Sequence, residues 1–166
     1  MSRKQSEKSN TTVRILKRST VPSISRRSRL LWEVGIDEKQ NLQIRVVSNS
    51  GGGCFNSEFI DLKAIEAALA KVPEDEPVTS SVLAPIFRGF SENNLHFTWA
   101  FLLDAGYLAP AGTGKRSYTK TEPKAFKDEI RALIEGKTVP GAKEKKSQGK
   151  VAVKTSAATK NRKSPS

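Results

Sequence analysis

The 166 residues of this chain divide by charge, and the division limits which part of it can form a hydrophobic core. Residues 1–29 contain nine Lys or Arg and one acid, and residues 136–166 contain the same numbers. Residues 30–135 contain eleven basic and fifteen acidic side chains. Segments as polar as the two ends bury too little apolar surface to offset the entropy lost on ordering. We therefore predict a disordered basic arm at 1–29, a single folded core at 30–135 and a disordered Lys-rich tail at 136–166.

The first part of the core, residues 30–60, shows the alternation typical of a sheet with one apolar face. On both sides of a turn at 37–41, every second residue is apolar: Trp32, Val34, Ile36, Leu42, Ile44 and Val46. After a second turn at 48–53 (SNSGGG), residues 54–60 form a third candidate strand. We predict a three-stranded antiparallel meander. It must pack against helices, because a small sheet is marginally stable alone.

The second part of the core, residues 61–135, shows helical periodicity. Apolar residues at three- and four-residue steps predict helices at 62–72, 92–105 and 124–135, and a short helix within 79–89. Asp61 and Ser91 suit N-cap positions, and Gly106 suits a helix end. Two short arms around the turn GTGKR predict a hairpin at 107–121. The expected fold class is α+β.

The order of elements in residues 79–135 resembles a winged helix-turn-helix domain. The resemblance is carried by the short helix, the longer helix at 91–106, and a wing-like hairpin with Lys115, Arg116 and Tyr118. In that family the helix after the turn usually lies in the DNA major groove, and the wing contacts the backbone or the minor groove. The resemblance implies these contacts: Ser91, Asn93, Asn94, His96 and Thr98 with bases, and Lys115, Arg116 and Lys120 with phosphates.

The basic arms indicate a polyanion as the partner. Clustered Lys and Arg neutralise phosphates and release counterions, which gives salt-dependent affinity with little dependence on sequence. We expect a non-enzymatic nucleic-acid-binding protein, with DNA favoured over RNA. The candidate residues outside the wing are Arg14, Lys17, Arg18, Arg26, Arg27 and Arg29 in the first arm and Lys143, Lys145, Lys146, Lys150 and Lys154 in the tail. A small core between Lys-rich tails is also similar in layout to linker histones.

Other interpretations stay open at this point. The predicted recognition helix at 92–105 contains no Lys or Arg, and the core is acidic around Glu74, Asp75 and Glu76. Those features suit an adaptor or regulator that binds a protein partner. An RNA-associated or ribosome-associated protein fits the same composition, and so do solvated tails that aid solubility. The sequence does not specify an oligomeric state.

The sequence favours no catalytic, metal, cofactor or membrane function. The glycine run 51–53 is followed by a predicted strand and not by the GK[ST] sequence and helix of a phosphate-binding loop. One cysteine, Cys54, excludes an intramolecular disulfide, and with His96 as the one histidine a zinc site is not expected. The chain has no apolar run of bilayer length and no signal-peptide pattern at 1–10. We expect an intracellular protein, either cytoplasmic or associated with the nucleoid or nucleus.

Overall fold

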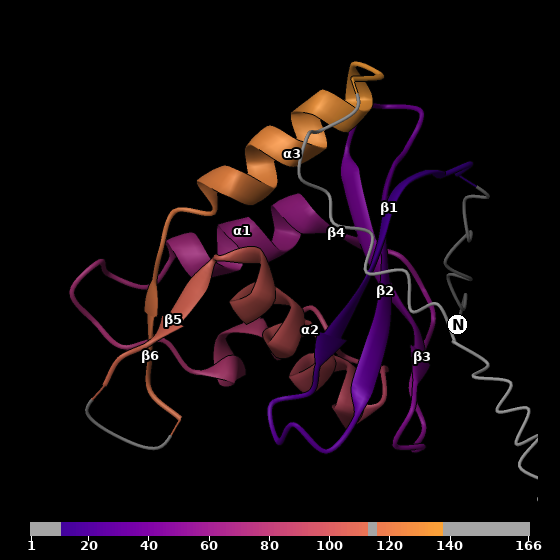
Figure 1. Cartoon of the computed structure of the whole chain (residues 1–166). Coiled ribbons are helices and arrows are strands. Elements are labelled where there is room, and N and C mark those ends of the chain that lie inside the picture. The colour runs from indigo at the N-terminus through magenta and orange to yellow at the C-terminus, as the bar shows by residue number, and fades with distance from the viewer. Residues whose placement is uncertain (1–10, 113–115, 138–166) are drawn as a thin grey trace, which may run out of the picture.

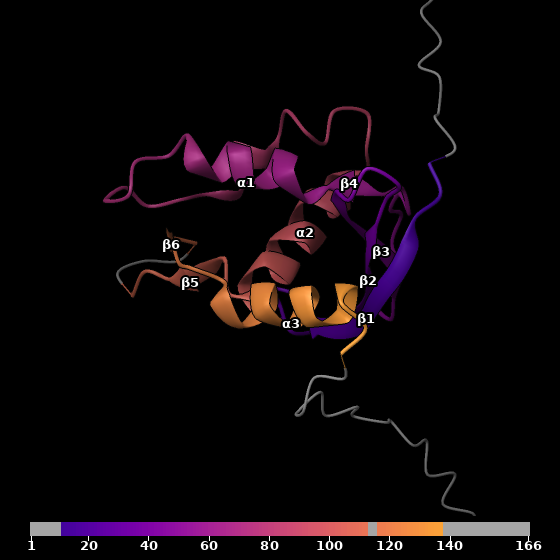
Figure 2. The ribbon, with the colours of Figure 1, turned by 90° about the horizontal axis from the view of Figure 1, so that it is seen from above.

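The structure, a computed structural model, describes residues 11–112 and 116–137. These residues form an α+β fold in which three helices lie on one face of a four-stranded antiparallel sheet, with a two-stranded hairpin beyond them (Figure 1). Seen from above, α2 (Glu92–Ala105) lies between α1 (Leu62–Ala70) and α3 (Lys124–Ile134) (Figure 2). The predicted α+β class is confirmed, but the main sheet has one strand more than expected.

The additional strand, β1 (Arg14–Pro22), comes from the arm predicted to be disordered. It pairs antiparallel with β2 (Arg29–Ile36), so the prediction of disorder over 1–29 is wrong for this part of the chain. Val21 is fully buried, and Leu16 packs against the core. This burial, together with the main-chain hydrogen bonds to β2, offsets the ordering entropy of a strand rich in charged residues.

A β-bulge explains why β1 does not alternate in the sequence. The register against β2 shifts between Ile15 and Lys17, which interrupts the period of two. The backbone of β1 also lies very close to Gly35 of β2. A Cβ atom at Gly35 would lie 2.9 Å from the carbonyl oxygen of Arg14 and would collide with the side chain of Val13. The glycine therefore permits β1 to pair.

The other edge of the sheet is shorter than predicted. β3 (Leu42–Asn49) pairs with β2 as expected, but β4 consists of Ile60–Asp61 alone. The prediction of a strand over 54–60 is wrong for 54–59. Several backbone groups of that segment bond to side chains from the start of α2 instead of to β3.

The ends of α1 and α2 follow the predicted caps. Asp61 accepts a hydrogen bond from the N–H of Lys63 at 2.9 Å, and Ser91 Oγ accepts one from the N–H of Asn93 at 3.4 Å. Gly106 ends α2 in the left-handed conformation, with φ of 87°.

The remaining elements are short. The helix predicted within 79–89 is limited to the 3₁₀ helix η1 (Ser80–Leu83), since Pro85 has no N–H to continue a helix. The predicted hairpin is present as β5 (Leu108–Pro110) and β6 (Tyr118–Lys120). Its tip residues 113–115 lie outside the described residues.

The core is centred on α2. The ring of Phe101 lies 5.0 Å from that of Trp32 in β2 and 5.8 Å from that of Phe126 in α3, measured between centroids. Trp99, also on α2, is 1% exposed. Because α2 is enclosed by the sheet and the other two helices, half of its side chains are buried and are not available to a partner.

Candidate nucleic-acid interface

The exposed arginines of β1 and of the turn after it form a basic surface. Residues 11–29 contain six Lys or Arg and no Asp or Glu. Lys17 is half-buried, and the exposed members are Arg14, Arg18, Arg26, Arg27 and Arg29. They belong to β1, to the β1–β2 turn and to the first residue of β2, so pairing within the sheet fixes their order in space.

The β1–β2 turn lies beside the glycine-rich loop that follows β3, and both are at the same end of the sheet (Figure 1). The N–H of Ser50 donates to the carbonyl of Arg29 at 2.9 Å, and the N–H of Arg29 donates to Ser50 Oγ at 2.8 Å. Gly52 and Gly53 have φ of 73° and 97°. The glycines therefore build a turn, as predicted, and no helix follows them directly.

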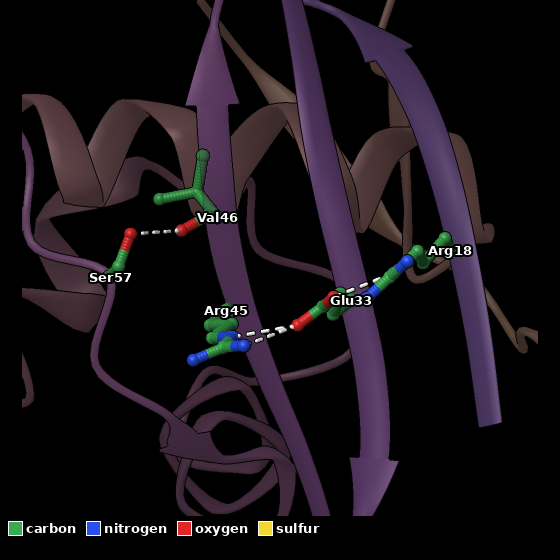
Figure 3. A network of polar contacts seen from close by, with 5 residues as sticks. All are labelled: Arg18, Glu33, Arg45, Val46 and Ser57. Carbon is green, nitrogen blue, oxygen red and sulfur yellow. Dashed lines mark hydrogen bonds and ion pairs between the residues drawn. The ribbon is translucent and has the colours of Figure 1, made fainter. Parts of the chain in front are cut away.

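An ion-pair network crosses three strands on the sheet face opposite the core (Figure 3). Glu33 is 2% exposed and lies 2.7 Å from Arg18 Nε and 2.7 Å from Arg45 Nη2. The guanidinium of Arg45 also stacks 4.4 Å from the ring centroid of Phe59. Burial acts to raise the pKa of Glu33, but hydrogen bonds and charges from Arg45 and Arg18 outweigh it and lower that pKa.

The ion-pair network leaves Arg18, but not Arg45, accessible to a phosphate. Arg45 is held between Glu33 and Phe59, whereas the side chain of Arg18 is 66% exposed and keeps an open side. Glu33 and Arg45 are not among the residues predicted from the sequence to form the site. Both occupy the polar positions of the predicted hairpin, and their opposite charges were the available signal.

Two of the predicted phosphate-binding lysines have partners inside the protein. Lys17 Nζ lies 2.7 Å from Glu129 Oε2 and ties β1 to α3. Lys120 Nζ donates to the carbonyl of Val72 at 2.6 Å and to Glu74 at 2.8 Å, and its side chain is 12% exposed. The assignment of Lys120 to phosphate is therefore corrected, and Lys17 is committed to its ion pair.

Two of the predicted base-reading residues on α2 are also corrected. Asn94 is 1% exposed and Thr98 is fully buried, so neither side chain can reach a base. Asn94 bonds to the backbone of residue 56, and Asn93 Nδ2 donates to the carbonyl of Cys54 at 2.8 Å. The polar start of α2 thus holds residues 54–56. Of the other three predicted positions, His96 is exposed, and Ser91 and Asn93 are half-buried.

The predicted site residues of the β5–β6 hairpin differ in their exposure to solvent. Arg116 is exposed, with φ of 73°. The Tyr118 ring is half-buried and packs edge-on against Trp99, with centroids 5.6 Å apart. The other predicted residues lie outside the described ranges: Lys115, Lys143, Lys145, Lys146, Lys150 and Lys154.

Two hollows lie among the helices. A crevice of about 170 Å³ between β1, α2 and α3 contains the Lys17–Glu129 pair and Asp104. Burial raises the pKa of Asp104, and the charge of Lys17 acts against that rise. A groove of about 390 Å³ lies between α1, β6 and the start of α3. On its wall the hydroxyl of Tyr107 donates to Glu66 at 2.8 Å, and burial, with a contribution from Glu66, raises the pKa of Tyr107.

Within residues 11–112 and 116–137 there is no group of three His, Cys, Asp or Glu side chains placed to hold a metal ion. Cys54 is an exposed free thiol, and no hydrogen bond joins it to His96. The helices in these ranges are all too short or too polar to cross a bilayer.

Comparison with known proteins gives no family assignment. The chain matches no protein-family model, no curated protein and no solved structure.

Proposed function

We propose that this protein binds duplex DNA through the phosphates and catalyses no reaction. The observation that carries the proposal is the set of exposed arginines on β1 and the β1–β2 turn, within residues 11–29, which contain no acid. A guanidinium can bond a phosphate through two N–H groups. Such contacts give affinity with little sequence information. We assign the Lys-rich segment 138–166 a similar role on its sequence alone.

The aromatic residues support a duplex as the partner in preference to a single strand. Proteins that bind single-stranded nucleic acid usually stack bases on accessible aromatic rings. Every Phe, Trp and Tyr of the chain lies within the described residues, and none of them is exposed. Phe59, which is half-buried, already stacks with Arg45. Binding through phosphates, without base stacking, is better suited to the regular backbone of a duplex than to a single strand.

The test is a salt series with the full chain and a matched pair of triple variants. Arg26→Gln/Arg27→Gln/Arg29→Gln removes three charges from the basic end of the sheet. Lys39→Gln/Lys71→Gln/Lys124→Gln removes three exposed charges from other elements. Each lost phosphate contact reduces the slope of log K against log salt by about 0.9. We expect the arginine variant to lose about 2 to 3 in slope and the lysine variant to retain nearly all of it.

Two outcomes would contradict the proposal. If the wild-type chain shows no salt-dependent binding to duplex DNA, the function is wrong. If the salt slope falls by the same amount in both triple variants, binding is a consequence of net charge. The β1–β2 turn and the start of β2 are then not the interface. Stronger binding to single-stranded RNA than to the duplex would move the assignment to RNA.

A second candidate function, contact with a basic protein, is favoured by the acidic side of the groove between α1 and α3. Glu66, Glu74 and Glu122 line this groove, and the last two pair there with Lys120 and Lys127. Asp75 and Glu76 are exposed in the adjoining loop. In the described residues neither Asp75 nor Glu76 has an ion pair. This function becomes the better assignment if the wild-type chain fails to bind both DNA and RNA.

A further inference from the structure

The turn between β1 and β2 places an exposed apolar side chain beside two exposed arginines. Ile24 is 43% exposed, and it is the one large hydrophobic residue among the described residues that is classed as exposed. Arg26 and Arg27 follow it within the same turn. A single exposed isoleucine on an ordinary surface needs no explanation. An apolar side chain next to arginines, however, is the combination with which many proteins enter a DNA minor groove.

The β1–β2 turn is restrained by its own hydrogen bonds and by contact with a neighbouring loop. The N–H of Ser23 donates to the carbonyl of Ser28 at 2.9 Å, and the N–H of Arg26 donates to the carbonyl of Ser23 at 2.8 Å. The neighbouring loop lies close against it, since a Cβ atom at Gly51 would lie 2.7 Å from the Cβ of Ser28. A turn restrained in this way loses little conformational entropy when it binds.

The backbone at Arg26 has a conformation that two other non-glycine residues of the described chain, Gln40 and Arg116, also adopt. Its φ of 59° lies in the left-handed region, which glycine adopts freely and other L-residues adopt with strain. The turn therefore contains a strained arginine where glycine would be relaxed. Strained positions of this kind are concentrated at functional sites. This conformation is consistent with a guanidinium that is used at the tip of the turn.

We propose that the β1–β2 turn enters the minor groove of A·T-rich duplex DNA, with Arg26 and Arg27 in the groove and Ile24 against a base step. The inference rests on the proposed binding of duplex DNA and specifies which part of the basic surface reaches the bases. Narrow A·T minor grooves have an enhanced negative potential that attracts arginine. Apolar side chains at base steps partly unstack them. The arginines of the strands then contact the flanking phosphates.

The experiment uses the full chain and a duplex with an A·T run of about one helical turn, with 2-aminopurine, a base whose fluorescence rises on unstacking, at the edge of the run, because its 2-amino group would otherwise lie in the A·T minor groove. Affinity and fluorescence are measured with and without netropsin, a small molecule that fills A·T minor grooves. For the wild-type chain we expect the fluorescence to rise on binding. We also expect netropsin to lower the affinity about tenfold or more, because the groove arginines lose their site.

Three variants separate groove contacts from phosphate contacts. Arg26→Gln/Arg27→Gln should bind weakly and lose its sensitivity to netropsin. Arg14→Gln/Arg29→Gln, which removes the same charge from the strands, should bind weakly but retain both netropsin sensitivity and the fluorescence rise. Ile24→Ala should abolish the fluorescence rise while the affinity falls about fivefold, as expected for a partly buried isoleucine.

The outcomes distinguish this inference from the proposed function. Binding of the wild-type chain that netropsin does not affect would overturn the minor-groove assignment and leave phosphate binding intact. Equal loss of netropsin sensitivity in the two arginine double variants would also overturn it. Failure of the wild-type chain to bind any duplex would overturn the proposed function itself.

Discussion

The side-chain amide of Asn94 bonds both backbone groups of Asn56. Its Oδ1 accepts from the N–H of Asn56 at 2.7 Å, and its Nδ2 donates to the carbonyl of Asn56 at 2.7 Å. In return, Oδ1 of Asn56 accepts from the N–H of Ser91, at 2.8 Å. The amide of Asn94 thus acts on Asn56 as a neighbouring strand would, because it bonds both backbone groups of that residue.

Asn94→Ala should destabilise the fold by about 2–4 kcal/mol, since two partly buried backbone groups lose their partner. Urea denaturation measures the change. Asn93→Ala is the matched control, because Asn93 makes a single exposed side-chain bond, to the carbonyl of Cys54. We expect that control to cost about 1 kcal/mol or less. An Asn94→Ala variant as stable as the wild type would show that the two bonds contribute nothing.

The two asparagines show where sequence reasoning about the site stops. Adjacent Asn residues after a serine cap suit base recognition and backbone bonding equally well, because both uses need the same donor and acceptor. What separates them is burial, and burial depends on which face of α2 meets the sheet. The same limit applies to Lys120, whose partners, Val72 and Glu74, are distant in sequence.

The fold was predictable where local chemistry decides it. The caps at Asp61 and Ser91 and the left-handed Gly106 are set by neighbouring residues, and all three were predicted correctly. β1 was not predicted because the features that identify it depend on residues distant in the sequence. A bulge breaks its alternation, and its partner, Gly35, is recognisable as the point of close approach only when the strands are paired.

Gly35→Ala should weaken the pairing of β1 with β2. The added methyl would collide with Val13 and crowd the carbonyl of Arg14, so β1 must shift outward. Overpacking of this kind costs about 1–3 kcal/mol. Hydrogen exchange should show faster exchange of the β1 amides than of the β3 amides. The double variant Gly35→Ala/Val13→Ala should recover part of the loss, and no recovery at all would refute the proposed collision.

Lys17 and Arg14 are both cations of β1, but we expect Lys17 to contribute to stability and Arg14 to contribute to DNA binding. Lys17→Gln removes the ion pair with Glu129, in which both side chains are less than a third exposed, and should cost about 1 kcal/mol. It should leave the salt dependence of DNA binding unchanged. Arg14→Gln should leave stability unchanged and reduce the salt slope by about 0.9. The two variants are compared by thermal unfolding and DNA titration, and the reverse pattern would contradict these roles.

Glu33 should make a measurable contribution to the acid sensitivity of the fold. Arg45 and Arg18 lower its pKa in the folded state against the opposing effect of burial, so its ionised form stabilises the protein above its unfolded pKa. That stabilisation is lost as pH falls through the lowered folded-state pKa. Glu33→Gln should cost about 1–3 kcal/mol near neutral pH. Its deficit relative to the wild type should shrink as unfolding is measured from about pH 7 to about pH 3. A deficit that stays constant over that range would mean that the carboxylate charge of Glu33 contributes no stability.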